Sequence, residues 1–168
     1  MSTGVALSLD VNGRPLSTHV DVNESLADVL RAHAGATDVK VGCGEGVCGT
    51  CTVLLDGEPV NSCLVFAVQA EGRSVATLRG LGDGNGGLHA LQRRFLSHGA
   101  SQCGFCTPGM VLTAEWFVAQ NPGADRDQIR EALSGNICRC TGYTKIVDAV
   151  EGYARELEGV PDEVSDVG

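Results

Sequence analysis

Eight cysteines carry the chemistry that this sequence of 168 residues could perform, and they fall into two sets of four. The first set has the spacing Cys43-x4-Cys48-x2-Cys51, with eleven residues between Cys51 and Cys63. A C-x4-C-x2-C run with a distant fourth cysteine is the spacing of plant-type [2Fe–2S] sites. The first set is therefore interpreted as the ligands of such a cluster.

Glycines surround the first three cysteines in the stretch VGCGEGVCGTC. Four of them lie within eight residues: Gly42, Gly44, Gly46 and Gly49. A loop that wraps a small anionic core must turn its N–H groups inward, and glycine permits the φ values and close approach this needs. A structural zinc site or buried thiols are the alternatives. Zinc loops prefer paired C-x2-C knuckles, so the pattern favours iron and sulfide.

The second set is Cys103-x2-Cys106 and, after 31 intervening residues, Cys138-x-Cys140. Four thiolates in two pairs could hold zinc or an iron–sulfur cluster. Spacing alone does not decide between the two.

The composition narrows the class of protein. Hydrophobic residues make up 43% of the chain, enough for a buried core, and the net charge of −9 argues against neutralising nucleic-acid phosphates. The absence of an apolar run of about 18 residues predicts no membrane span. The start, MSTGVALSLDVNG, resembles a first strand rather than a signal peptide, so we expect a cytoplasmic protein whose cysteines serve metal or redox chemistry rather than disulfides.

The first half of the chain has the pattern of a small sheet with one helix. Val5, Leu7, Leu9 and Val11 alternate as in a half-buried strand, and Asn12-Gly13 predicts a tight hairpin turn. Asn23 or Ser25 can cap a helix that ends near Gly35. The other expected strands are 15–20, a hairpin over 52–62 that turns at Asp56-Gly57, and 73–78.

The second half has helical periodicity. Leu88, Leu91 and Phe95 share one face, Thr107-Pro108 predicts a capped helix start, and Asp125 with Gln128 resembles a capping box. A last helix starting at Thr144 places Ile146, Val150, Tyr153 and Leu157 in register. The predicted organisation is a sheet domain (1–79), a glycine-rich connector (80–87), a domain of about four helices (88–160) and a frayed tail (161–168).

Four long motifs together resemble the iron–sulfur (small) subunit of the molybdenum hydroxylases, the group of xanthine dehydrogenase, aldehyde oxidase and carbon monoxide dehydrogenase. The motifs are GCGEGVCGTCTVLLDG, NSC, QCGFCTPGM and GNICRCTGY. The resemblance covers nearly the whole chain, in the family's order and spacing. It implies an α+β fold: an N-terminal plant-ferredoxin-like β-grasp domain and a C-terminal four-helix [2Fe–2S]-binding domain.

The resemblance also implies what each site holds. It assigns Cys43, Cys48, Cys51 and Cys63 to one [2Fe–2S] cluster and Cys103, Cys106, Cys138 and Cys140 to a second, on facing helix N-termini. It places Gln102 and Cys140 near a molybdopterin held by a large partner subunit. It places the loop of Gly44, Glu45 and Gly46 toward FAD on a medium partner subunit. A dimer of heterotrimers is expected.

The implied function is electron transfer during water-dependent hydroxylation of a substrate. Electrons would pass from molybdopterin through the second and then the first cluster to FAD, and this chain would perform no bond-making chemistry itself. Two other hypotheses remain: a free-standing ferredoxin with a zinc-stapled helical domain, and a redox-silent module whose cysteines bind zinc.

Overall fold

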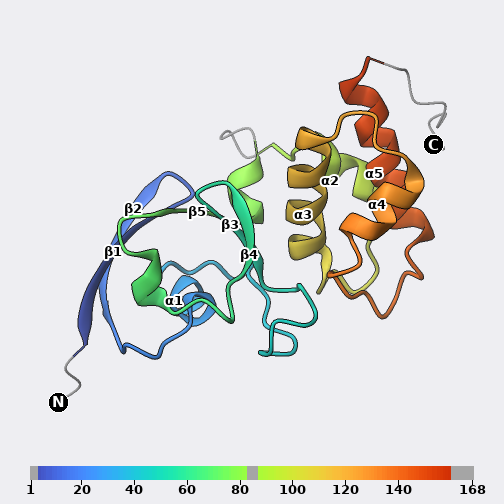
Figure 1. Cartoon of the computed structure of the whole chain (residues 1–168). Helices are drawn as coiled ribbons and strands as arrows, with labels where there is room; N and C mark the ends of the chain where they lie inside the picture. The colour runs from blue at the N-terminus through green and yellow to red at the C-terminus, as the bar shows by residue number, and fades with distance from the viewer. Residues whose placement is uncertain (1–3, 83–86, 160–168) are drawn as a thin grey trace.

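The structure is a computed structural model that describes residues 4–82 and 87–159. A five-stranded sheet that carries one α-helix lies beside a group of four α-helices (Figure 1). The fold is α+β, with the strands in the first half of the chain and the helical group in the second, as predicted. Of the predicted connector, residues 83–86 lie outside the described residues, and so does the predicted tail 161–168.

The sheet has the strand order β2-β1-β5-β3-β4. Its strands are β1 (Val5–Val11), β2 (Arg14–Val20), β3 (Thr52–Leu55), β4 (Glu58–Asn61) and β5 (Ser74–Ala76). Only the β1–β5 pair is parallel among the strand pairs of the described residues; β1–β2, β3–β4 and β3–β5 are antiparallel. Both hairpins turn where the sequence predicts, with positive φ at Asn12 and Gly13 and at Asp56 and Gly57.

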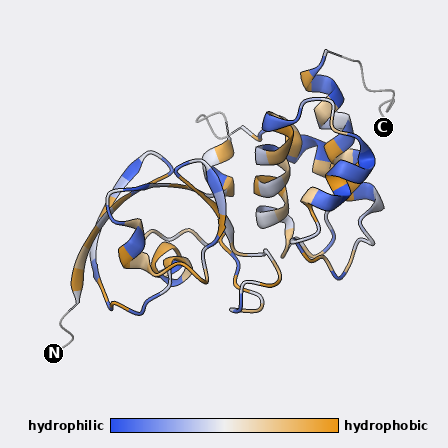
Figure 2. Cartoon of the chain, viewed as in Figure 1, coloured by the Kyte–Doolittle hydropathy of each residue, from blue (hydrophilic) through white to orange (hydrophobic). Residues whose placement is uncertain are grey.

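Helix α1 (Leu26–Ala32) packs its apolar face on the sheet domain's core. Ser25 caps it by accepting a hydrogen bond from the Asp28 N–H. Two short 3₁₀ helices are also present: η1 (Ala67–Ala70) follows the edge strand β4, and η2 (Leu78–Leu81) follows the central strand β5. Figure 2 shows the hydrophobic residues of the strands and α1 together in this half of the molecule. A mixed sheet packed against one helix is the expected β-grasp arrangement.

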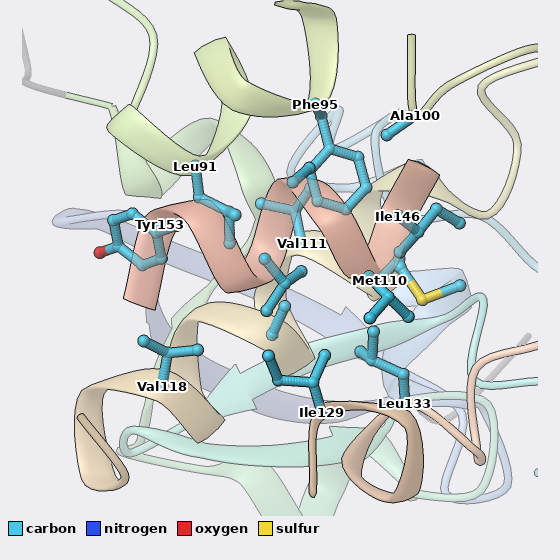
Figure 3. Close-up of a cluster of buried hydrophobic side chains, with 14 of the residues drawn as sticks. Leu91, Phe95, Ala100, Met110, Val111, Val118, Ile129, Leu133, Ile146 and Tyr153 are labelled. Carbon is cyan, nitrogen blue, oxygen red and sulfur yellow. The ribbon is translucent and has the colours of Figure 1, made fainter. Parts of the chain in front are cut away.

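The second core lies between four helices, α2 (Ala90–Ser97), α3 (Thr107–Gln120), α4 (Arg126–Ala132) and α5 (Thr144–Leu157). Figure 3 shows side chains from all four converging, including Phe95, Met110, Ile129 and Ile146, each of which is at most 2% exposed. The predicted Asp125–Gln128 capping box is present at α4.

Three details of the helical prediction are wrong. Leu88 precedes α2 and is 45% exposed, because the helix begins only at Ala90. Leu157 is 51% exposed, since it is the final residue of α5 and extends beyond the packed core. Thr107 is the first residue of α3 rather than its cap; Cys106 holds the N-cap position and makes no side-chain capping bond.

The helical group contacts the sheet through α3, which packs against β3 and β4. At the start of α3, Gly109 lies against the backbone of the first cysteine loop: a Cβ there would be 3.1 Å from the Thr50 carbonyl oxygen. Only glycine allows this close approach. The two halves of the chain are therefore in contact next to both cysteine sets. None of the described helices combines the length and the apolar character needed to cross a membrane.

Candidate metal centres

The first cysteine loop, residues 42–51, leads into β3 and is shaped by glycine. Gly44, Gly46 and Gly49 all have positive φ, a conformation that side chains disfavour. The loop turns its backbone toward sulfur, since the Glu45 N–H lies 3.3 Å from Cys43 Sγ. The sheet fixes the other end: Ser62, between β4 and Cys63, donates its hydroxyl to the Cys51 carbonyl oxygen at 2.6 Å.

The thiols of the first set have unlike environments. Hydrogen bonds from backbone N–H groups, first that of Glu45, lower the pKa of the exposed Cys43 to about 6. Burial raises the pKa of Cys51 to about 11, and the neighbouring Cys63 thiol adds to this effect. A loop that stabilises one thiolate by N–H groups suits a negatively charged group bound at its open side.

The second set is assembled from two loops, each of which leads into a helix. Cys106 occupies the N-cap position of α3, and Cys138 and Cys140 lie in the turn before α5. The fold brings the pairs together: Cys140 Sγ and Cys103 Sγ are 3.5 Å apart. Four residues far apart in sequence thus form one group near two helix N-termini, where the helix dipole favours negative charge.

Neighbouring groups also tune the second set. Burial, followed by the adjacent Cys138, raises the pKa of Cys106 to about 12. Burial opposes ionisation of Cys138, but hydrogen bonds from the Thr141 hydroxyl, at 3.1 Å, and backbone N–H outweigh it and lower its pKa. The hydrogen bond with Cys103 raises the pKa of Cys140.

Tyr143 holds the turn that carries Cys138 and Cys140. Its φ of +69° is unusual for a bulky side chain. Its hydroxyl accepts a hydrogen bond from the Cys138 N–H at 2.8 Å and donates one to the Asn136 carbonyl at 3.1 Å. These bonds offset a backbone strain of about 1–3 kcal/mol and fix the direction of the turn.

The donor set fits [2Fe–2S] clusters. All eight cysteines are free thiols, in two groups of four, and thiolates are the ligands that such clusters require. In the described parts of the chain, no three Cys, His, Asp or Glu side chains converge as a ready-made site for a single ion. The fit therefore rests on the sulfur donors and on the N–H and O–H groups directed at them.

Comparisons with known proteins agree with this chemistry. Residues 9–76 match the family described as the 2Fe-2S iron-sulfur cluster binding domain, and residues 77–151 match the [2Fe-2S] binding domain. The chain is 48% identical to the nicotine 6-hydroxylase small subunit of Paenarthrobacter nicotinovorans, over 89% of each chain. It is 46% identical to the nicotinate dehydrogenase small FeS subunit of Eubacterium barkeri, over 90% of this chain and 96% of that one.

A solved structure matches equally well. The quinoline 2-oxidoreductase of Pseudomonas putida superposes with a TM-score of 0.87 at 50% identity, over 91% of this chain and 94% of that chain. The chain belongs to the iron–sulfur subunits of the molybdenum hydroxylases. Its role is electron transfer within a multi-subunit oxidoreductase, and its cofactors are two [2Fe–2S] clusters, one for each matched domain.

Most of the residues predicted to face partner cofactors lie at the surface of this iron–sulfur subunit. Gln102 and Cys140 are exposed on the helical side; in the first cysteine loop Gly44 and Glu45 are exposed and Gly46 is partly buried. The first group lies next to the second cysteine set and the second group lies within the first cysteine loop.

Sequence reasoning missed the polar residues that hold these loops together. Tyr143 and Asn136 both belong to the motif GNICRCTGY, but the sequence pattern gives neither of them a role. Asn136 is only 4% exposed although it lies in a loop, and its side-chain amide donates to the Gly49 carbonyl oxygen at 3.0 Å. Its position directly before Ile137-Cys138 was the one available indication, and burial of a loop asparagine is visible only in the fold.

Proposed function

We propose that this iron–sulfur subunit conducts electrons between a molybdopterin on a large partner subunit and FAD on a medium partner subunit. One [2Fe–2S] cluster would be held by Cys43, Cys48, Cys51 and Cys63, and the other by Cys103, Cys106, Cys138 and Cys140. The clusters supply one-electron redox chemistry when bound. The observation that carries the proposal is the folding of eight free thiols into two groups that contact each other through their loops.

The chain's own residues serve to bind, tune and dock. The Glu45 N–H and the Thr141 N–H and hydroxyl point at cysteine sulfurs. Donors of this kind stabilise negative sulfur and so raise the reduction potential of the group that the sulfur ligates. No general acid or base is needed, because no proton transfer to a substrate occurs on this chain.

The helical side is proposed to face the molybdopterin. Gln102 and Cys140 are both exposed, and the loops that carry them lie side by side, since Cys103 Sγ and Cys140 Sγ are 3.5 Å apart. The side-chain amide of Gln102 forms no hydrogen bond within the described residues. A free amide next to an exposed ligand sulfur can bind a pterin edge. This would make Cys140 the residue through which electrons enter the chain.

The loop of Gly44, Glu45 and Gly46 is proposed to face FAD. Gly44 and Gly46 have positive φ, which favours glycine, and because neither carries a side chain a partner's cofactor could approach the first site closely. Electrons would leave the chain here.

Apolar side chains around both sites support docking of partner subunits. Five large exposed hydrophobic residues lie within two residues of a proposed ligand: Val41, Val47, Leu64, Phe105 and Ile137. We call this group the apolar rim. Exposed apolar groups that gather around a functional site mark protein interfaces. Copies of the large and medium subunits are expected to cover the rim in a cytoplasmic dimer of heterotrimers.

The rim offers a matched test. Val47 is 62% exposed and directly precedes Cys48, whereas Val22 is 63% exposed and lies 21 residues before the first cysteine of the chain. Val47→Asp is expected to abolish copurification of the FAD subunit with the tagged chain, while Val22→Asp retains it. Iron analysis of both variants controls for cluster loss. Equal retention of the FAD subunit by the two variants, with full iron, would contradict docking at this rim.

Purification of the tagged chain from its own source tests the wider proposal. Large and medium subunits that carry molybdenum, pterin and FAD should copurify in equal amounts. A chain that purifies alone with iron and zinc would instead be a free-standing ferredoxin with a zinc-stapled helical domain, a function that the relatives do not favour.

The substrate of the complex is not selected by this chain under the proposal. The relatives of this chain are subunits of enzymes named for different substrates. The chain is 44% identical to a caffeine dehydrogenase subunit of Pseudomonas and 36% identical to an aldehyde oxidoreductase subunit of Escherichia coli. The selecting residues are expected on the large subunit.

A further inference from the structure

Asn61, the last residue of β4, contacts the first cysteine loop from the sheet. Its side-chain amide donates a hydrogen bond to the Gly46 carbonyl oxygen at 2.9 Å. Its backbone is fixed on both sides, since Asn61 pairs with Thr52 of β3 and its carbonyl oxygen accepts a hydrogen bond from the Leu64 N–H at 2.9 Å. The amide therefore reaches the loop from a rigid part of the fold, two residues before the proposed ligand Cys63.

The loop alone does not fix the peptide that Asn61 contacts. Gly46 has a φ of +73°, and glycine adopts many combinations of backbone angles at little cost. The peptide between Gly46 and Val47 could therefore rotate about the bonds on either side of it. The Leu64 side chain packs so closely over Gly46 that a Cβ at this position would collide with it. This contact limits the position of the loop, and the Asn61 hydrogen bond sets the direction of the carbonyl.

The opposite side of the same peptide faces a cysteine sulfur. Hydrogen bonds from backbone N–H groups, that of Glu45 first, lower the pKa of the Cys43 thiol to about 6, and the Val47 N–H is one of these donors. In a planar trans peptide the C=O and N–H bonds point in opposite directions. A donor that fixes the Gly46 C=O therefore also directs the Val47 N–H at Cys43 Sγ. A carbonyl that accepts a hydrogen bond also polarises its own peptide, which strengthens the N–H as a donor.

We propose that Asn61 is a positioning residue that raises the reduction potential of the cluster proposed for the first cysteine set, by orienting the Gly46–Val47 peptide. This inference rests on the proposed function. One electron enters the oxidised cluster and adds one negative charge; no bond forms or breaks, and the Val47 proton stays on its nitrogen. A donor directed at a ligand sulfur favours the reduced form over the oxidised form. A higher potential at the first site favours transfer of each electron toward it from the second site.

Redox titration of Asn61→Leu in the purified complex, followed by EPR, tests this role. The variant keeps a side chain of similar size but removes the donor. At the potential where the ferredoxin-domain cluster of the unaltered complex is half reduced, the ratio of reduced to oxidised cluster should fall about three- to tenfold, the effect of one hydrogen bond of ordinary net strength. The helical-domain cluster, titrated in the same sample, should keep its potential. An unchanged potential of the first cluster, or an equal shift of both, would overturn the inference.

Asn121→Leu is the matched control. The Asn121 side-chain amide also donates to a backbone carbonyl oxygen at 2.9 Å, that of Phe117, but at the C-terminal end of α3, whereas Cys106 precedes the start of this helix. Both cluster potentials should remain unchanged in this variant.

A spectroscopic readout separates orientation of the peptide from a general loss of structure. Proton ENDOR of the reduced complex in H₂O and in D₂O detects the exchangeable N–H protons close to each cluster. The coupling from the Val47 N–H to the ferredoxin-domain cluster should weaken in Asn61→Leu and persist in Asn121→Leu. An unchanged set of exchangeable couplings in Asn61→Leu would contradict the positioning role.

The outcomes also separate this inference from the proposed function. If the unaltered chain holds no iron and gives no cluster signal, the proposed function fails. Two clusters with unchanged potentials in Asn61→Leu would refute only the role of Asn61. A midpoint potential does not depend on the amount of cluster, so partial loss leaves the measurement valid. If Asn61→Leu holds no ferredoxin-domain cluster, Asn61→Ala, which removes the same donor without adding methyl groups, gives the same test.

Discussion

The two cysteine sites are built in opposite ways. Three cysteines of the first set lie within nine residues of one glycine-rich loop, and only Cys63 arrives from elsewhere, directly after β4. The second set joins two pairs separated by 31 residues, which meet only when α3 and α5 pack together. The first site is therefore determined mainly by local backbone conformation, and the second by the tertiary packing of the helical core.

This difference has a consequence for stability. Loss of packing between helices should open the second site while the glycine loop keeps its shape. Damage confined to the glycine loop should in turn leave the turn with Cys138 in place, because Tyr143 and Thr141 secure that turn through hydrogen bonds within it. The sites nonetheless share one contact, at Cys48 and Ile137, so damage at that point should affect both.

Removal of a ligand is the largest expected effect and tests whether the sites are separate. Cys63→Ser should lose the EPR signal of the ferredoxin-domain cluster, and Cys106→Ser that of the helical-domain cluster, because each set supplies all four thiolates of one cluster. Iron should fall by half in each variant. Loss of both signals from either variant, in a chain that remains folded by circular dichroism, would contradict two separate sites.

A matched pair of core substitutions tests the dependence on packing. Leu30 in α1 and Leu91 in α2 are both completely buried. Each Leu→Ala change should cost about 2–5 kcal/mol of unfolding free energy in its own domain. During heating, Leu91→Ala should release the helical-domain cluster first, as followed by EPR after quenching. Earlier release of the ferredoxin-domain cluster from this variant would reverse the expected order.

Two glycines with the same backbone conformation test the shared contact. Gly13 and Gly49 both have positive φ, but a Cβ at Gly13 meets nothing within 4 Å whereas one at Gly49 collides with Gly135 and Asn136. Gly13→Ala should cost about 1–2 kcal/mol for its left-handed backbone. Gly49→Ala should add about 1–3 kcal/mol for overpacking. Denaturant unfolding of the two variants measures the difference, and equal losses would show that the loops do not pack tightly.

The smallest expected effect is a difference in reactivity between two thiols of the first cysteine set. With its pKa lowered to about 6, Cys43 is mainly a thiolate near neutral pH, whereas Cys51, with its pKa raised to about 11, remains a protonated thiol. In the cluster-free chain, iodoacetamide should modify Cys43 first, and its rate should fall as the pH drops through about 6. Mass spectrometry of the peptides measures both rates. Faster modification of Cys51 would contradict these environments.

Much of the fold could be predicted from the sequence because its elements carry local determinants. The turns at Asn12-Gly13 and Asp56-Gly57 require residues that tolerate positive φ, and the capping box at Asp125 depends on residues three apart. The errors at Leu88 and Leu157 arise at helix ends. The spacing of hydrophobic residues in the sequence continues across each helix end, but the packing of side chains into the core stops there.

The cysteine sets could be predicted as groups, but the contact between them could not. Spacing and glycine content identify the first loop, and the resemblance to a family pairs the second set. Asn136 and Gly49 are 87 residues apart, and nothing local in either segment indicates the partner. Such a contact depends on how α3 docks on β3, which is a property of the whole fold.

The central claim, that this chain holds two [2Fe–2S] clusters as an electron-transfer subunit, is tested most directly by metal and sulfide analysis combined with EPR of the reduced protein. The expected result is about four iron and about four sulfide per chain, with two distinguishable EPR signals and no bound zinc. About two iron with one zinc and a single signal would contradict the claim.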